Sequence, residues 1–119
     1  MRSFEFDEVR DFCLSYRYVS ESFPFDTHTM VWKVDGKVFA IADIDDFTGI
    51  SLKCSPERAI ELREQFQGVR PGWHLNKKHW NSVDAESDVP LKLVGELIEH
   101  SYERVVASMT KKSRLELGL

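Results

Sequence analysis

The feature that most constrains the fold of this chain is an Asp-Gly pair between two β-prone runs. Asp35 and Gly36 separate residues 30–34 from residues 37–43, and both runs are rich in β-branched and aromatic side chains. A two-residue Asp-Gly connection is typical of a type I′ hairpin, because both central residues take positive φ. The sequence therefore predicts an antiparallel hairpin. The expected cross-strand pairs are Val34 with Lys37, Trp32 with Phe39, and Met30 with Ile41.

This pairing would give the hairpin one apolar face and one outer face, because successive side chains in a strand point to opposite sides. The outer face would hold Val31, Lys33, Val38 and Ala40. Residues 50–54 alternate in the same way and predict a third strand. In that strand Lys53 would share the outer face with Lys33.

Three helices are predicted from apolar spacing and from residues that favour helix ends. Residues 6–16 carry apolar side chains three and four positions apart. Ser55-Pro56-Glu57 supplies an N-cap, a proline at the first helical position and an early carboxylate, and predicts a helix to about Gln67. A long helix follows Pro90 and is expected to end at Lys111, Lys112 and Arg114, where cations suit the helix dipole.

Two further segments have weaker patterns. Residues 69–83 favour a second hairpin with short aromatic arms and a basic tip around residues 76–78. Residues 18–27 contain Pro24 and scattered polar side chains, so no regular element is predicted there. Phe23 and Phe25 are expected to pack inward.

The expected order is helix, three strands, helix, two strands, helix, which indicates an α+β fold. We predict a single antiparallel β-sheet with helices packed on one face (α-βββ-α-ββ-α). The length of 119 residues predicts one domain over residues 1–119. Cys13 and Cys54 have no CxxC spacing, so we expect reduced, mostly buried thiols.

Several segments together resemble the MmcQ/YjbR family. They are FPFD at Phe23–Asp26, VWKVDGKVFA at Val31–Ala40, ISLKCSPE at Ile50–Glu57, PGWHLNKKHWNSV at Pro71–Val83 and SYERV at Ser101–Val105. The most specific part is the PG-aromatic-H-x-NK-x-HW block. The resemblance implies a frataxin-like (CyaY-like) fold and a DNA-binding role described as a double-wing arrangement. It supplies no catalytic motif.

Net charge and the absence of targeting patterns restrict the expected partners and the expected location of the chain. The formal net charge of -4 opposes binding to a polyanion as a global field, so any nucleic-acid site must be a local basic patch. The N-terminal residues do not look like a signal peptide, and no apolar run approaches the length needed to span a bilayer. We therefore expect a cytoplasmic protein with no membrane partner.

The predicted second hairpin carries the best candidate for a nucleic-acid site. Cations and aromatic rings together can contact phosphates and stack on bases. The candidate residues are Lys77, Lys78, His79 and Trp80, supported by Arg70 and His74 nearby and by Lys33 and Lys53 on the outer sheet face. The competing interpretation is that Trp73 and Trp80 anchor the core, and that the lysines belong to a solvated turn or an ordinary wetted sheet face.

No pattern indicates an enzyme, a cofactor or a metal. The sequence contains neither GxSxG nor a phosphate-binding GxxxxGK[ST] loop, and no catalytic residue is predicted. The histidines and clustered aspartates match no recognised metal signature. They are His28, His74, His79, Asp43, Asp45 and Asp46. Carboxylates on the first helix (Glu5, Asp7, Glu8 and Asp11) suggest a frataxin-like metal-binding surface, but exposed helix charge explains them equally well.

The sequence thus predicts a non-enzymatic binding module, with DNA as the leading partner. The alternative is a module that binds a protein or a small ligand, through the outer sheet face or a groove beside Trp73 and Trp80. The surface around Lys33, Lys53, Lys77 and Lys78 discriminates between them. A contiguous patch without interleaved carboxylates would favour DNA.

Overall fold

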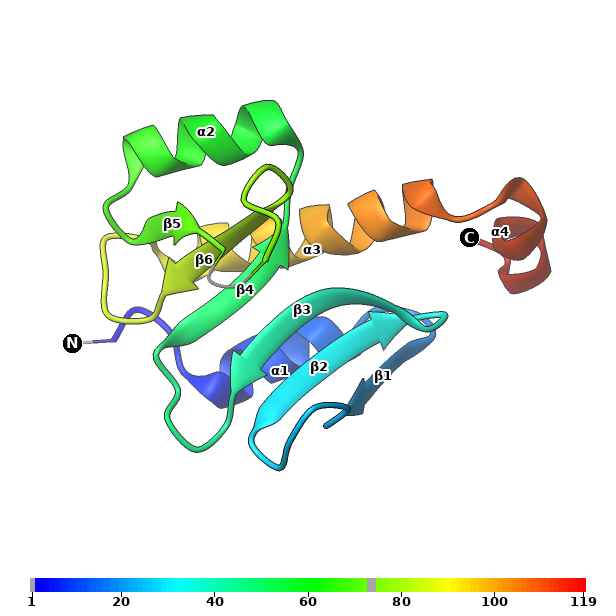
Figure 1. Cartoon of the computed structure of the whole chain (residues 1–119), viewed down its shortest axis with the longest axis horizontal. Coiled ribbons are helices and arrows are strands. Elements are labelled where there is room, and N and C mark those ends of the chain that lie inside the picture. Colours follow the sequence, from blue (N-terminus) through cyan, green and yellow to red (C-terminus); the bar gives the residue numbers. More distant parts are fainter. Residues whose placement is uncertain (1, 73–74) are drawn as a thin grey trace.

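The computed structural model describes residues 2–72 and 75–119 and contains a single antiparallel sheet with helices on one face (Figure 1). This confirms the α+β class and the single antiparallel sheet. Within the described residues there are six strands, in the order β1-β2-β3-β4-β6-β5. The strands are β1 (Val19–Ser22), β2 (Thr29–Val34), β3 (Lys37–Asp43), β4 (Gly49–Lys53), β5 (Val69–Pro71) and β6 (Trp80–Asp84), and the helices are α1 (Phe6–Leu14), α2 (Pro56–Gln65), α3 (Leu91–Ser108) and α4 (Lys111–Leu117).

The turn between β2 and β3 has the predicted conformation, but the hairpin register shifts away from it. Asp35 and Gly36 have φ of 49° and 76°, as a type I′ turn requires. Val34 pairs with Lys37 as expected. The register then shifts between Trp32 and Lys33, so that Trp32 pairs with Ala40, Met30 with Ala42 and Val31 with Ile41.

The cause is a bulge at Phe39, which places one extra residue in β3. As a result Ala40 is fully buried within the core cluster, whereas Ile41 pairs with Val31 on the outer face. The predicted pairs of Trp32 with Phe39 and Met30 with Ile41, and the outer position of Ala40, are therefore wrong. Side chains in a strand alternate between the two faces, so a one-residue insertion changes the pairing and the face of every later side chain in that strand.

A serine of α3 supports the sheet at this bulge. The Ser101 hydroxyl donates to the Phe39 carbonyl at 2.5 Å and accepts from the Lys53 backbone N–H at 2.9 Å. It thereby bridges β3 and β4 where they diverge. Ser101 is fully buried, so both of its hydrogen bonds are made in a dry environment.

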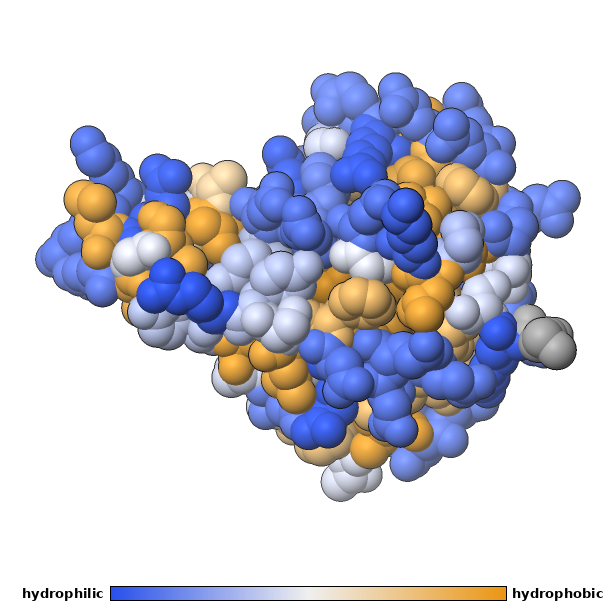
Figure 2. All heavy atoms as spheres, turned by 180° about the vertical axis from the view of Figure 1, so that it is seen from behind, coloured by the Kyte–Doolittle hydropathy of each residue, from blue (hydrophilic) through white to orange (hydrophobic). Residues whose placement is uncertain are grey.

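The hydrophobic core lies between the sheet and helices α1 and α3, which cover one face of it (Figure 1). We call the opposite face of the sheet the outer face. The helices approach closely because α3 has Gly95 at the contact, where an added Cβ would lie 2.9 Å from the Phe12 ring of α1. From behind, this covered side shows hydrophobic residues in its middle, between hydrophilic ones (Figure 2).

The segment left unassigned by the sequence contains an edge strand, β1. Its anchor is Glu21, which accepts hydrogen bonds from the Trp32 indole at 3.2 Å and from the Arg10 guanidinium at 2.9 and 2.6 Å. The hydrogen bond from Arg10 holds the pKa of Glu21 below its usual value. Phe23 and Phe25, expected to pack inward, are 41% and 74% exposed.

The C-terminal cations do not end the long helix. Met109 has extended backbone and a buried side chain, which stops α3 at Ser108. Thr110 then caps a new helix, α4, by accepting a hydrogen bond from the Ser113 N–H at 3.1 Å. Lys111 and Lys112 therefore occupy the first turn of α4, and the predicted interaction with the end of the α3 dipole is wrong.

None of the described helices is both long enough and apolar enough to cross a membrane. Cys13 and Cys54 are buried and form no disulfide with each other, as predicted. Burial raises the pKa of both thiols.

Candidate nucleic-acid interface

Lysines from two strands lie on the outer face, toward the same end of the sheet. In the sheet ladder Lys33 of β2 pairs with Val38, and Lys53 of β4 pairs with Trp80 of β6. Directly paired residues point to the same side of a sheet, and Lys53 is two positions from Ser51 on the same face. Lys77 and Lys78 lie in the turn just before β6, separated from Trp80 by His79. We call Lys33, Lys53, Lys77, Lys78 and Trp80 together the basic row.

The tip that carries Lys77 and Lys78 is a tight turn organised by Asn76. The Asn76 carbonyl accepts from the backbone N–H groups of His79 at 3.1 Å and Trp80 at 2.9 Å. Its side-chain oxygen accepts from the Lys78 N–H at 2.9 Å, as in an Asx-turn. Both lysine side chains of this turn are exposed.

Arg63 of α2 fixes this turn against the body of the protein. Its guanidinium donates to the carbonyl oxygens of Lys77 and Trp80 and, at 2.7 Å, to the side-chain oxygen of Asn81. Asn81 is buried and donates in turn to the Ala59 carbonyl of α2 at 3.3 Å. Arg63 is not among the predicted site residues, because an arginine on a charged helix gives no signal of its own.

Gly72 allows the chain that leads into the turn to lie against β6. Its N–H donates to the Trp80 carbonyl at 3.0 Å, and a Cβ at this position would lie 2.9 Å from Trp80 Cβ. The His79 carbonyl accepts from the Cys54 N–H at 2.7 Å, which ties the turn to the end of β4. Together these contacts hold the turn beside Lys53.

Among the described residues, the cations of the basic row form no ion pairs. Within residues 2–72 and 75–119, no carboxylate lies within ion-pair distance of Lys33, Lys53, Lys77 or Lys78. The carboxylate nearest to Lys33 in the chain is Asp35 of the β2–β3 turn, two residues before Lys37 at the start of β3. The row is therefore a local basic patch on an acidic protein.

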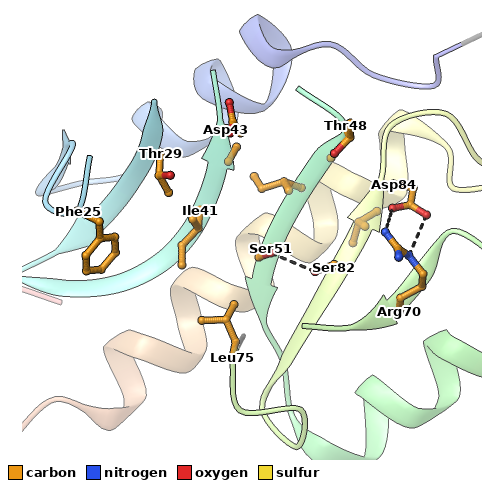
Figure 3. A pocket seen from close by; sticks show the side chains of 14 residues that line it. Phe25, Thr29, Ile41, Asp43, Thr48, Ser51, Arg70, Leu75, Ser82 and Asp84 are labelled. Atoms are coloured by element: carbon orange, nitrogen blue, oxygen red, sulfur yellow. Dashed lines mark hydrogen bonds and ion pairs between the residues drawn. The ribbon is translucent and has the colours of Figure 1, made fainter. Parts of the chain in front are cut away.

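Arg70 is not part of this patch. It pairs with Ser82 in the sheet, and its guanidinium donates to both carboxylate oxygens of Asp84, at 2.6 and 3.1 Å (Figure 3). Asp84 lies at the opposite end of β6 from Trp80. Arg70 thus differs from the described lysines of the basic row in that its charge is compensated by a carboxylate.

The loops at that opposite end hold a second compensated cluster. His28 lies between two carboxylates, with Nδ1 2.9 Å from Asp43 and Nε2 3.3 Å from Asp26. The hydrogen bond with Asp43, helped by the charge of Asp26, raises the pKa of His28. Asp43 also accepts from the backbone N–H groups of Asp45 and Asp46, at 2.8 and 2.9 Å, which builds the β3–β4 turn.

Between the basic row and these clusters, the outer face is hollowed into a groove of about 680 Å³ (Figure 3). Ile41 lies toward its middle, beside the hydroxyls of Ser51 and Ser82, which are 3.1 Å apart. Phe25 and Leu75 rise at its sides. The sequence predicted none of these as site residues, because small hydroxyls on strands and an aromatic side chain in a loop are common in any sequence.

The tryptophans of the second hairpin were predicted either to join the interface or to anchor the core. Trp80 is half-buried and stands on the outer face rather than in the core cluster. The predictions about Trp73 and His74 lie outside the described residues.

The fold and surface define a small α+β protein with an open sheet face that carries a basic row and a groove. A model of the YjbR family matches residues 14–104, and the chain belongs to that family. It is 32% identical to uncharacterized protein YjbR of Escherichia coli K12 over 90% of this chain and 92% of the relative. It is also 28% identical to uncharacterized protein YbdF of Escherichia coli O157:H7 over 91% of this chain and 89% of the relative.

A solved structure shares both fold and sequence with this chain. The crystal structure of Deinococcus radiodurans protein DR2400, with domain DUF419, has a TM-score of 0.90 and 42% identity, and the match covers 95% of this chain and 87% of that one. A Pseudomonas syringae protein matches with a TM-score of 0.72 at 22% identity, over 85% of this chain and 98% of that one, and shares the fold.

Proposed function

We propose that this protein is a non-enzymatic nucleic-acid-binding module whose basic row contacts phosphates, with DNA as the leading partner. The proposal rests on four lysines that have no ion-pair partner in the described part of the chain and that lie near a half-buried Trp80 on an open sheet face. Lysines contact phosphate oxygens without reading sequence, and an aromatic ring stacks on a base.

The charges of the neighbouring residues support this location. A cation already held by a carboxylate gains less from a phosphate, because it must give up its partner. Arg70 is held in this way by Asp84, whereas the lysines of the basic row are not. We therefore omit Arg70 from the interface and keep Lys33, Lys53, Lys77, Lys78 and Trp80, with His79 joining the turn to β4.

The proposal includes two finer assignments that the sequence suggested. One is that the fold is of the frataxin (CyaY-like) type, which the single antiparallel sheet with α1 and α3 on one face supports. The other is a cytoplasmic location, where such a module would meet nucleic acid.

The test is a fluorescence-anisotropy titration of labelled single- and double-stranded DNA at several salt concentrations. Each phosphate contact releases counterions, so four lysines predict a slope of log affinity against log salt of about -3 for a single strand. Lys77→Glu should weaken binding and reduce this slope by about one unit or more.

Lys92→Glu is the matched control, because it makes the same charge change at an exposed position on α3, which covers the other face of the sheet. It should leave the slope unchanged. Absence of binding at low salt, or equal effects of the two variants, would contradict the proposal.

A second candidate is the predicted protein- or small-ligand-binding module, which the groove of about 680 Å³ favours. Ligand pockets typically have volumes of roughly 300–1,000 Å³. A partner captured by the groove alone would bind with little dependence on salt and would be indifferent to Lys77→Glu.

A further inference from the structure

The groove and the basic row form one continuous surface along β4 and β6. Ser51 lies two residues from Lys53, and Ser82 two residues from Trp80, on the same sides of their strands. Positions two apart in a strand are separated by about 6.6 Å. A chain molecule held by the lysines therefore has the groove within the reach of its next unit.

The groove suits a flat, largely uncharged group. Phe25 offers an aromatic ring that is 74% exposed, and Leu75 and Ile41 add apolar surface. The charged groups that line the groove are compensated, since Arg70 is paired with Asp84, and Asp43 with His28 beside it. A phosphate would find no free cation among these described rim residues, whereas a ring system gains from the apolar walls.

Polar groups in the groove complement the edge of such a ring. The hydroxyls of Ser51 and Ser82 hydrogen-bond to each other, and either can donate, so the pair presents both a donor and an acceptor. Asp84 keeps acceptor capacity beyond its two bonds from Arg70, and a carboxylate accepts from a ring N–H such as N3–H of thymine.

We propose that the groove takes one unpaired base of a nucleic-acid strand whose phosphates lie on the basic row. This inference rests on the proposed function and deepens it, because a base can enter the groove only when it is not stacked and paired in a duplex. The protein would then prefer single-stranded over double-stranded nucleic acid.

The experiment compares two labelled single strands of equal length, about twelve nucleotides, which is within the usual site size. One is a thymidine oligonucleotide. The other has every base replaced by a tetrahydrofuran abasic site, so that only the sugar-phosphate backbone remains. Both are titrated against the wild-type protein, Phe25→Ala and Phe23→Ala.

Phe23→Ala is the matched control, because Phe23 is a neighbouring phenylalanine that is 41% exposed and does not line the groove. Stacking of one base on an aromatic ring predicts that Phe25→Ala weakens binding of the thymidine strand about 5- to 150-fold. The same variant should leave binding of the abasic strand unchanged, and Phe23→Ala should affect neither strand.

The outcomes separate this inference from the function on which it rests. Equal affinity of the wild-type protein for both strands, with a steep salt dependence, overturns the groove assignment and leaves phosphate binding by the basic row intact. Equal effects of Phe25→Ala on the two strands also overturn it. If neither strand binds at low salt, both proposals are overturned.

Discussion

The two ends of the outer sheet face differ in whether their cationic side chains are paired with carboxylates. At one end, the lysines of the basic row stand on strands and on a tight turn with no ion-pair partner among the described residues. At the other end, Arg70 is bound to Asp84, and His28 is bound to Asp43 and Asp26. Paired charges build and fix loops, whereas unpaired charges held by backbone contacts remain available to an external ligand.

The largest effect is expected at Ser101, which supports the strand that carries Lys53 of the basic row. Ser101→Ala would leave the Phe39 carbonyl and the Lys53 N–H without partners in a dry environment. We expect a loss of about 2–4 kcal/mol in the free energy of unfolding, measured by urea denaturation. Ser108→Ala, on the same helix, is the control. Its hydroxyl bonds only the Val105 carbonyl of its own helix at an exposed position, so a similar loss there would contradict the assigned role of Ser101.

The anchor of the turn is the next most sensitive position. Arg63→Lys keeps the charge but cannot reproduce the contacts to Lys77, Trp80 and Asn81. We expect a loss of about 1–3 kcal/mol in stability and weaker DNA binding, although every lysine of the row remains. Arg58→Lys on the same helix should change neither quantity. Unchanged DNA binding by a destabilised Arg63→Lys protein would show that the turn geometry does not matter for the interface.

The interaction of His28 with Asp26 and Asp43 at the other end of the outer face can be tested by its pH dependence. Both ring nitrogens of His28 face carboxylates, so the arrangement is strongest when the ring is protonated. The pKa of His28 is raised above 6.5, so its contribution to stability is present below about pH 6.5 and is lost as pH rises through the raised value.

The partner carboxylates have the opposite dependence. The pKa values of Asp26 and Asp43 lie below 3.8, mainly through hydrogen bonds from backbone N–H groups, so their contributions are present above pH 3.8 and are lost in stronger acid. NMR titration of the His28 ring should show a pKa above 6.5 in the wild type, and a lower value in Asp43→Asn. An unshifted ring would contradict the bridge.

The smallest expected effect sharpens the contrast between paired and unpaired cations. Arg70→Gln removes an exposed ion pair and should cost no more than about 1 kcal/mol in stability. It should leave the salt slope of DNA binding unchanged, whereas Lys78→Gln, with the same loss of one charge, should reduce the slope by about one unit. Equal slopes for the two variants would mean that pairing with Asp84 does not withdraw Arg70 from the interface.

Local signals predicted the elements whose conformation depends on neighbouring residues. The Asp35-Gly36 turn and the helix start at Ser55-Pro56 are both where the sequence places them. The strand β1 escaped prediction, because VSES is a half-exposed edge strand without an apolar alternation. Its place is set by Glu21, whose partners Arg10 and Trp32 each lie 11 positions away in the chain.

The candidate interface was predictable only in part, for the same reason. Strand alternation brought Lys33 and Lys53 to one face, and the basic tip was visible as a run of sequence. The exclusion of Arg70 depends on Asp84, 14 positions away, and the groove depends on Phe25, Ser51 and Ser82 from separate parts of the chain. Sequence periodicity describes one element at a time and does not report which elements meet.

The sequence by itself determined the turn types, the helix starts and the alternation of β4, because φ preferences, capping and side-chain periodicity are properties of adjacent residues. The tertiary structure alone decided the register beyond the Phe39 bulge, the break before α4 and the pairing state of each cation. Phe39 and Ser101 are 62 residues apart, and only packing of α3 on the sheet brings the hydroxyl to the carbonyl it satisfies. Burial makes such long-range hydrogen bonds matter, since an unpaired polar group inside the protein is costly.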